Sequence, residues 1–378
     1  MIYLDNAATT QLHPDVLTSM LPYLTTNYGN PSSSYRMGQI AKNAIQTARK
    51  QVATYIGAKE NEIYFTSGGT ESNNWVLTSI CKMYSGKHII TSSIEHHAIL
   101  HTCEYLEKCG YTITYLPVDK DGLVSPLDVK KAICKDTVLI SIMTANNEIG
   151  TLQPIQEIGK ISNENNILFH TDAVQALGNI PIDVQELNVD LLSLSAHKVY
   201  GPKGVGALYI KQGTRIQNLL FGGAQEKNMR AGTENVAGIV GMGKAITLLK
   251  DKSTKQIEEM RNKLWLGLIK AYPDLILNGH KTKRLPGNLN ICIPNIPSNT
   301  LPVLLDMANI AVSTGSACSS GLTEPSHVLR AIGVSNSIIN NVIRLSIGQF
   351  NTPDEMDITI KKIVDILQTL RKKEQTHE

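Results

Sequence analysis

The feature that most constrains the fold is a regular alternation of short apolar runs with helical patterns between residues 60 and 210. The runs read EIYFTS, KHIITSS, YTITYL, TVLISIM, NILFHTDA, VDLLSLSA and VGALYI. Several are continuously apolar, which is typical of strands buried on both faces. Helical patterns fall between most of them. This rhythm predicts an α/β fold, with a mixed, mostly parallel sheet flanked by helices.

Two helices precede the first of these strands. The segment PDVLTSMLPYL places Pro14 in the first turn of a helix, where the missing N–H costs nothing. A longer helix is predicted over 35–56, with Gly57 as its C-terminal cap. Its predicted apolar stripe consists of Met37, Ile40, Ala44, Ala48, Val52 and Ile56.

Near residue 250 the pattern changes. A long helix, KSTKQIEEMRNKLWLGLIKAY, leads to the short strand-like runs LILNG, NLNICI, NIAVST and VIRLSIG and to a closing helix from about Asp354. We therefore expect a large domain over 15–252 and a smaller α+β domain over 253–378. The first residues, 1–14, are expected to pack with the small domain.

Composition excludes several function classes. The chain has 378 residues and a formal net charge of +3, too small to indicate nucleic-acid binding in the absence of a basic stripe. Its 6 cysteines include no CxxC pair, so we expect neither a disulfide framework nor a metal site. No signal peptide and no apolar run of about 18 residues is evident. We expect a cytoplasmic protein that contacts no membrane.

Polar side chains follow the strands, where ligands bind in open α/β sheets. Gly68, Gly69 and Thr70 follow the first strand and open a helix, an arrangement that suits either a phosphate or a plain helix cap. His96 follows the next strand and is placed to face a ligand. The pair His97 and His101 could share a helix face, but no third zinc ligand is evident.

Three further strands end in candidate residues. Asn147 follows one, and Asp172 ends an apolar strand, where a carboxylate is costly without a positive partner. Lys198 follows a nearly continuous apolar strand, next to Ser195 and His197. Such a lysine is either an exposed charge or a desolvated amine able to form a Schiff base.

Together these residues meet the needs of pyridoxal 5′-phosphate. That cofactor requires a lysine for its aldehyde, a carboxylate for its pyridine nitrogen, donors for its phosphate and a flat group over its ring. The combination is more specific than any of its members alone.

The motifs resemble those of a known family. YLDNAATT, GNPSS, FTSGGTESNN, HTDAVQALG, SLSAHKVYGPKGVGALY, MRAGTEN and STGSACSSG followed by EPSHVLRAIG occur in the order found in the cysteine desulfurases. These are fold-type I pyridoxal phosphate enzymes of the class V aminotransferase superfamily. The short segment around Cys318 resembles the NifS/IscS-like group, and the resemblance covers essentially the whole chain.

The resemblance implies a role for each matching residue. Lys198 would hold the cofactor covalently, Asp172 would pair with the pyridine nitrogen, and His96 would stack on the ring and move protons. Gln175 would bond the phenolic oxygen of the cofactor. Further cofactor contacts would come from Gly69, Thr70, Asn147, Ser195, His197 and Thr233.

Other implied roles concern the substrate and the assembly. Thr233 would reach the phosphate from the other subunit, which implies a homodimer. Asn147 and Arg344 would bind the substrate α-carboxylate, for which the guanidinium fork is suited. Cys318 would be the nucleophile, carried on a segment rich in glycine and serine that moves at low cost.

The implied reaction converts L-cysteine to L-alanine and leaves the sulfur on Cys318 as a persulfide. An acceptor protein would then take that sulfur for iron–sulfur cluster assembly or for tRNA thiolation. The sequence ends soon after its last predicted helix, so from the resemblance we expect the tail that helps dock an iron–sulfur scaffold in longer relatives to be short or absent. A selenocysteine lyase or another class V enzyme remains an alternative. A nucleotide-binding α/β protein is disfavoured because no strand is followed by GxGxxG.

Overall fold

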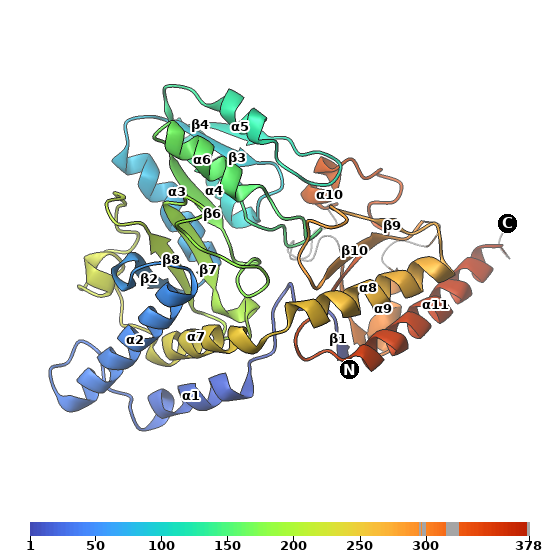
Figure 1. Ribbon diagram of the computed structural model, residues 1–378, viewed down its shortest axis with the longest axis horizontal. Coiled ribbons are helices and arrows are strands. Elements are labelled where there is room, and N and C mark those ends of the chain that lie inside the picture. The colour runs from blue at the N-terminus through green and yellow to red at the C-terminus, as the bar shows by residue number, and fades with distance from the viewer. Residues whose placement is uncertain (295, 297–299, 315–324, 376–378) are drawn as a thin grey trace.

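The computed structural model describes residues 1–294, 296, 300–314 and 325–375 (Figure 1). The large domain contains helices α1 (Pro14–Thr25), α2 (Arg36–Tyr55), α3 (Gly69–Met83), α4 (His97–Lys108), α5 (Pro126–Ala132), α6 (Ile155–Glu164) and α7 (Val236–Leu248). Its strands are β2 (Ile63–Thr66), β3 (His88–Ser92), β4 (Thr112–Leu116), β5 (Thr137–Ser141), β6 (Leu168–Asp172), β7 (Leu191–Ser195) and β8 (Gly206–Ile210).

All the predicted strand runs of the large domain form one sheet. Over the described part of the chain it has seven strands in the order β2-β8-β7-β6-β5-β3-β4. β8 is antiparallel to both its neighbours, whereas β7, β6, β5, β3 and β4 run parallel. The predicted α/β class and mixed, mostly parallel sheet are therefore confirmed.

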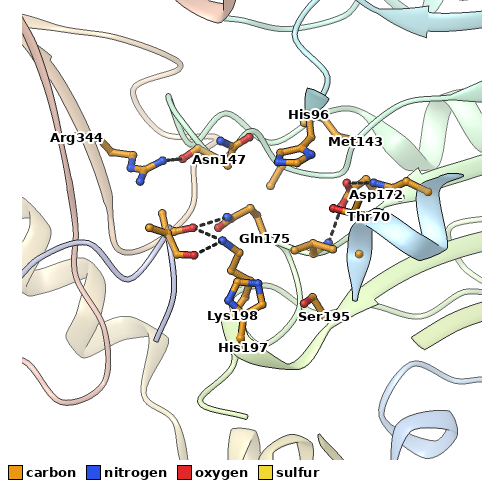
Figure 2. Close-up of a pocket in the computed structure, with 16 residues that line it drawn as sticks. Thr70, His96, Met143, Asn147, Asp172, Gln175, Ser195, His197, Lys198 and Arg344 are labelled. Carbon is orange, nitrogen blue, oxygen red and sulfur yellow. Dashed lines mark hydrogen bonds between the residues drawn. The ribbon is translucent and has the colours of Figure 1, made fainter. Parts of the chain in front are cut away.

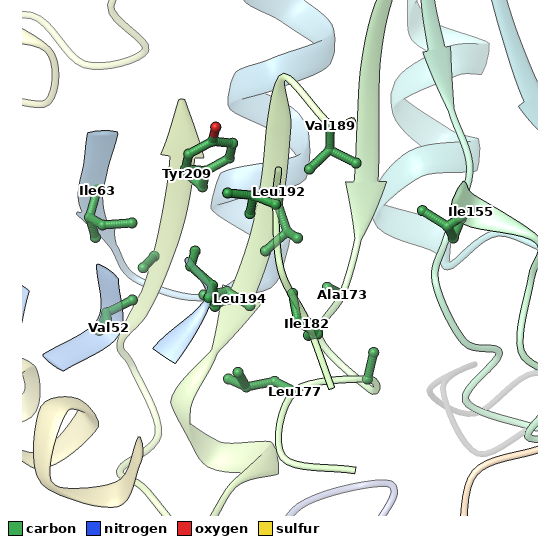
Figure 3. Close-up of a cluster of buried hydrophobic side chains, with 14 of the residues drawn as sticks. Val52, Ile63, Ile155, Ala173, Leu177, Ile182, Val189, Leu192, Leu194 and Tyr209 are labelled. Carbon is green, nitrogen blue, oxygen red and sulfur yellow. The ribbon is translucent and has the colours of Figure 1, made fainter. Parts of the chain in front are cut away.

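Consecutive residues of a strand face opposite sides of this sheet, and helices cover both sides. Leu191 joins a cluster with residues of α3 and α4, whereas its neighbour Leu192 joins the cluster formed with α2, α6 and α7. Figure 3 shows part of this second cluster. Because a strand alternates its side chains with period two, continuous apolar runs are required for burial on both faces.

The predicted stripe of α2 is wrong in its first half. Gly38, Ala41 and Ile45 are buried, each one residue beyond the predicted position, whereas Ala48 and Val52 are buried as expected. Gly38 is buried because an added Cβ there would overlap the Ser33 carbonyl oxygen of the preceding loop, and farther along α2 packs closely on α7, where a Cβ added at Gly243 would lie 2.8 Å from Ala48 Cα. Small residues therefore face the partner helix.

In the segment expected as the small domain, the described residues form a four-stranded sheet in the order β12-β13-β10-β9, packed against helices. Its elements are α8 (Thr254–Ala271), β9 (Ile276–Leu277), β10 (Asn288–Cys292), α9 (Thr300–Met307), β11 (Ile310–Ala311), β12 (Ser313–Thr314), α10 (His327–Ala331), β13 (Val342–Ser346) and α11 (Pro353–Gln375). Helices α8 and α11 lie side by side (Figure 1). Among the described helices, none combines the length and the apolar character that a membrane crossing needs.

The run NIAVST is not one strand, as predicted, but two. β11 pairs in parallel with the N-terminal strand β1 (Ile2–Tyr3), while β12 pairs with β13. The chain changes sheets at Val312, so Ser313 lies opposite Arg344. The N-terminus is thereby held against the small domain before the chain continues into α1.

Candidate active site

A cavity of about 330 Å³ lies at the carboxyl ends of β5, β6 and β7, between the two domains (Figure 2). Such ends are where α/β sheets bind ligands, and the volume suits a small organic molecule. Of the predicted site residues, those that line it are Gly69, Thr70, His96, Asn147, Asp172, Gln175, Ser195, His197, Lys198 and Arg344. Folding thus brings together residues that are far apart in the sequence.

One end of the cavity has the backbone groups that bind an anion. Helix α3 begins at Gly69, so the N–H groups of its first turn are available to a ligand. A Cβ added at Gly69 would lie 2.6 Å from Val174 Cγ2, so a side chain there would disturb this helix start. Ser195 ends β7 and lines the same cavity.

A carboxylate lies deeper in the cavity. Asp172 ends β6, and its Oδ2 accepts a 2.6 Å hydrogen bond from Asn73 Nδ2. Its Oδ1 accepts from the Val174 N–H at 2.9 Å. Sequence reasoning missed Asn73, although its position three residues after Thr70 places it on the same helix face. Both oxygens are thus held in a fixed orientation.

Lys198 ends the short 3₁₀ turn Ala196–Lys198 after β7. Its Nζ donates to the carbonyl oxygens of Ala7 and Ala8, both at 2.6 Å. The same Ala7 oxygen accepts from Gln175 Nε2 at 2.9 Å. The amine and the amide are therefore arranged around one stretch of N-terminal backbone, a contact that the motif YLDNAATT did not reveal by itself.

His96 is the N-cap of α4, and its Nδ1 accepts a hydrogen bond from the Ala98 N–H at 3.1 Å. Burial lowers its pKa; Asp172 opposes this effect, whereas the Lys198 charge adds to it. The ring is therefore neutral near pH 7. Since Nδ1 accepts, the proton is assigned to Nε2.

His197 lines the same cavity. Its Nδ1 lies 3.1 Å from Thr9 Oγ1. Burial, reinforced by Lys198 and Lys203, lowers its pKa to about 4. A neutral ring at this position contributes a hydrogen bond rather than a charge.

Behind His96 lies a buried acid that the sequence did not single out. Glu95 Oε1 accepts from Ser92 Oγ at 2.6 Å and from the Met143 N–H at 3.0 Å. Burial raises the pKa of this carboxyl to about 8. Glu95 thereby links Ser92, at the end of β3, to Met143, two residues beyond β5, and helps to hold Met143 on the cavity wall.

Arg344 closes the opposite end of the cavity. The side chain lies in β13 and is only 2% exposed. Its Nη1 donates to the Asn147 carbonyl oxygen at 3.0 Å, and its Nη2 donates to Asp5 Oδ1 at 2.7 Å. The Nε atom is buried and has no hydrogen-bond partner among the described residues. Because Nε is enclosed, the donors available to an anionic ligand in the cavity are the second N–H groups of Nη1 and Nη2.

Two predicted site residues are not placed in this cavity. Thr233 lines a separate cavity of about 190 Å³ with Arg230 and Glu226. Cys318 lies outside the described residues. The prediction that Thr233 serves the partner subunit and the prediction that Cys318 is the nucleophile both stay predictions.

In the tertiary structure, His327 of α10 lies next to the histidine pair of α4. The rings of His97 and His101 have centroids 4.8 Å apart, and His327 lies 4.8 Å from His97. Within the described residues, however, no three histidine, cysteine or acidic side chains are arranged to hold a metal ion.

The residues present fit pyridoxal 5′-phosphate. An amine, a fixed carboxylate, an imidazole and a helix N-terminus line one cavity, and each answers a different part of that molecule. The buried Asp172 carboxylate in particular has hydrogen-bond donors but no salt-bridge partner among the described residues, which suits a cationic ring nitrogen.

Comparisons with known proteins agree with the family that the sequence motifs resemble. Residues 2–358 match the family model for class V aminotransferases. The chain is 55% identical over 375 residues to cysteine desulfurase IscS of Methanosarcina thermophila, covering 98% of this chain and 93% of the relative. It is 52% identical to cysteine desulfurase IscS of Dictyoglomus turgidum, covering 98% and 95%.

Solved structures give the same result. A NifS-like protein superposes with a TM-score of 0.91 at 40% identity, covering 98% of this chain and 100% of that one. A structure described as SspA in complex with cysteine superposes with a TM-score of 0.84 at 38% identity, covering 93% and 100%. The expected fold and cofactor class are confirmed, because class V enzymes of this kind depend on pyridoxal 5′-phosphate. The chain therefore belongs to the class V aminotransferase family, within its NifS/IscS-like cysteine desulfurases.

Proposed function

We propose that this protein is a cysteine desulfurase that converts L-cysteine to L-alanine and passes the sulfur, through Cys318, to an acceptor protein. The observation that carries the proposal is the cavity where Lys198, Asp172 and His96 meet Arg344 in a chain of this family. One half of the cavity suits the cofactor, and the other half suits an amino-acid carboxylate.

The reaction balances without an added oxidant or reductant. The carbon–sulfur bond of L-cysteine breaks, a sulfur–sulfur bond to Cys318 forms, and the former thiol-bearing carbon becomes the methyl group of alanine. The two thiol protons, one from L-cysteine and one from Cys318, are accounted for by the new methyl hydrogen of alanine and by the persulfide S–H. Bound pyridoxal 5′-phosphate supplies an aldehyde for the substrate amine and a ring that takes up the electron pair left by the α-proton.

The described residues divide the remaining work. Arg344 and Asn147 bind the α-carboxylate, and Asp172 keeps a ring nitrogen protonated. Lys198 Nζ is the group placed to take the α-proton. His96 is neutral, with Nδ1 occupied and its proton on Nε2, so it acts as a donor rather than as the base.

A homodimer is part of the proposal. Thr233 lies away from the Lys198 cavity in its own chain, as expected of a residue that serves a partner. Helix α1 and the loop after it also expose a row of apolar side chains: Leu17 at 46%, Leu21 at 47%, Leu24 at 60% and Tyr28 at 73%. A row of this kind supports burial against a second copy.

The acceptor and the cellular location complete the proposal. The acceptor is an iron–sulfur scaffold or a tRNA-thiolating enzyme. Five cysteines are free in the part of the chain that the structure describes, which supports a reducing, cytoplasmic setting. Incubation of the loaded enzyme with each purified acceptor class, followed by assay of acceptor persulfide, distinguishes the two.

The test of the activity uses the purified holoenzyme, L-cysteine and a reductant. We expect a yellow protein that produces sulfide and alanine in equal amounts. Cys318→Ala should keep the colour and lose sulfide release, whereas Lys198→Ala should lose the covalently held cofactor absorbance. Cys109→Ser, which changes an exposed cysteine at the C-terminal end of α4, is the matched control. Normal turnover by Cys318→Ala would refute the assignment, and a clear preference for L-selenocysteine would favour the lyase alternative.

A further inference from the structure

The N-terminal segment 5–10, here called the strap, contacts both halves of the active-site cavity. Its members are Asp5, Asn6, Ala7, Ala8, Thr9 and Thr10. The Ala7 and Ala8 carbonyls accept from Lys198, and Thr9 Oγ1 contacts His197. Dashed lines in Figure 2 mark the hydrogen bonds that Lys198 and Gln175 donate to this segment. The function proposed above gives no role to this segment.

The strap is fastened to the small domain as well. The Ala7 N–H donates to Ser346 Oγ at 2.8 Å, and Asn6 Nδ2 donates to the Ser346 carbonyl oxygen at 2.8 Å. Tyr3 Oη donates to the Thr9 carbonyl oxygen at 2.8 Å, which closes the strap into a loop. The position of Asp5 is therefore set by several hydrogen bonds on both sides.

From this position Asp5 reaches Arg344 from outside the cavity. The 2.7 Å bond from Arg344 Nη2 to Asp5 Oδ1 uses one donor, and the 3.0 Å bond from Nη1 to the Asn147 oxygen uses another. Asp5 itself does not line the cavity, whereas Arg344 does. The two bonds fix the plane of the guanidinium and use one N–H of each Nη atom, so the second N–H of each remains for a ligand in the cavity, whereas Nε is enclosed by protein.

We infer that Asp5 is a positioning residue, which holds Arg344 so that its free donors recognise the α-carboxylate of an amino-acid substrate. The inference rests on the proposed function. Its physical basis is that arginine binds a carboxylate best through two parallel N–H groups in one plane, a geometry that a freely rotating side chain does not keep. Misplacement of a binding group by about 1 Å can cost on the order of 100-fold.

The experiment compares two ligands of the holoenzyme that differ by one carboxylate, L-alanine and ethylamine, by titration of the visible absorbance. In Asp5→Ala we expect the dissociation constant of L-alanine to rise roughly tenfold or more, while that of ethylamine changes less than about twofold. Asp5→Asn, which keeps an acceptor oxygen, should lose less. Asp15→Asn, an acid of α1 outside the cavity, is the control.

The outcomes separate the two proposals. Equal weakening of both ligands would mean that Asp5 only stabilises the fold, and tighter L-alanine binding would mean that it competes with the substrate; either result overturns the inference. If the wild-type holoenzyme did not distinguish the two ligands, or Arg344→Lys had no effect on L-alanine, the proposed carboxylate site itself would be wrong. Intact L-alanine binding without sulfide production would refute the proposed function and leave the role of Asp5 standing.

Discussion

Replacing Arg49 by methionine should destabilise the protein severely, because it strands a buried carboxylate. Arg49 Nη1 and Nη2 donate to Glu226 Oε2 and Oε1, both at 2.8 Å, and each side chain is only 3% exposed. After the replacement, Glu226 keeps the Phe65 N–H, at 2.9 Å, as its hydrogen-bond donor within the described residues. Leaving such a charge unpaired costs about 3–5 kcal/mol.

Losing the ion pair should also destabilise the backbone of residues 226–228, which precede Thr233. Glu226, Lys227 and Asn228 have φ values of 45°, 59° and 67°, so three consecutive residues other than glycine adopt the left-handed region. That conformation costs about 1 kcal/mol or more per residue and persists only where surrounding contacts hold it. We therefore expect Arg49→Met to loosen cofactor retention as well as to lower thermal stability.

The assay is thermal unfolding of the holoenzyme at fixed protein and cofactor concentrations, since ligand binding shifts the apparent Tm. With an unfolding entropy of about 2.1 cal/mol/K per residue, the Tm of a 378-residue chain shifts by about 1.3 °C per kcal/mol, so Arg49→Met should lower Tm by roughly 4–6 °C. The double replacement Arg49→Met with Glu226→Met should recover part of the loss, because no buried charge is left unpaired, although the Ile63 carbonyl and the Phe65 N–H lose their side-chain partners. A single variant within about 2 °C of wild type, or a double variant as unstable as the sum of both single replacements, would refute the reasoning.

Three further predictions concern pH, assembly and the cofactor. Burial lowers the pKa of His170 to about 3, so the contribution of its neutral ring to stability is complete above its ordinary pKa of about 6.5 and decreases as the pH falls below that value. The Tm difference between wild type and His170→Asn should therefore shrink between pH 7 and pH 5. A Tm difference that stays constant over this range would contradict the prediction. Leu24→Glu should convert the proposed dimer to monomers in light scattering, whereas an unchanged mass would exclude α1 from the interface. Asn73→Ala removes the 2.6 Å bond to Asp172 and should weaken cofactor binding about tenfold in an absorbance titration, and an unaltered dissociation constant would show that Asn73 has no such role.

Much of the fold follows from local pattern. Runs such as VDLLSLSA identify strands because two-sided burial demands continuous apolar residues, and their alternation with helices predicts the sheet. The residues after those strands were predictable site candidates for the same reason: the ends of parallel strands meet at one edge. Asp172 and Lys198 could be singled out in this way, since a charge is costly at the end of a buried strand.

What the sequence alone determined is thus the α/β class, the strands and the chemical types at their ends, all of which depend on neighbours along the chain. Only the tertiary structure decided which distant groups meet: Asp5 on Arg344, the Ala7 carbonyl on Lys198, and Thr233 in a cavity of its own. It also split NIAVST between two sheets. The Asp5–Arg344 and Ala7–Lys198 contacts join residues 339 and 191 positions apart, and their geometry is set by how whole elements pack rather than by any local preference.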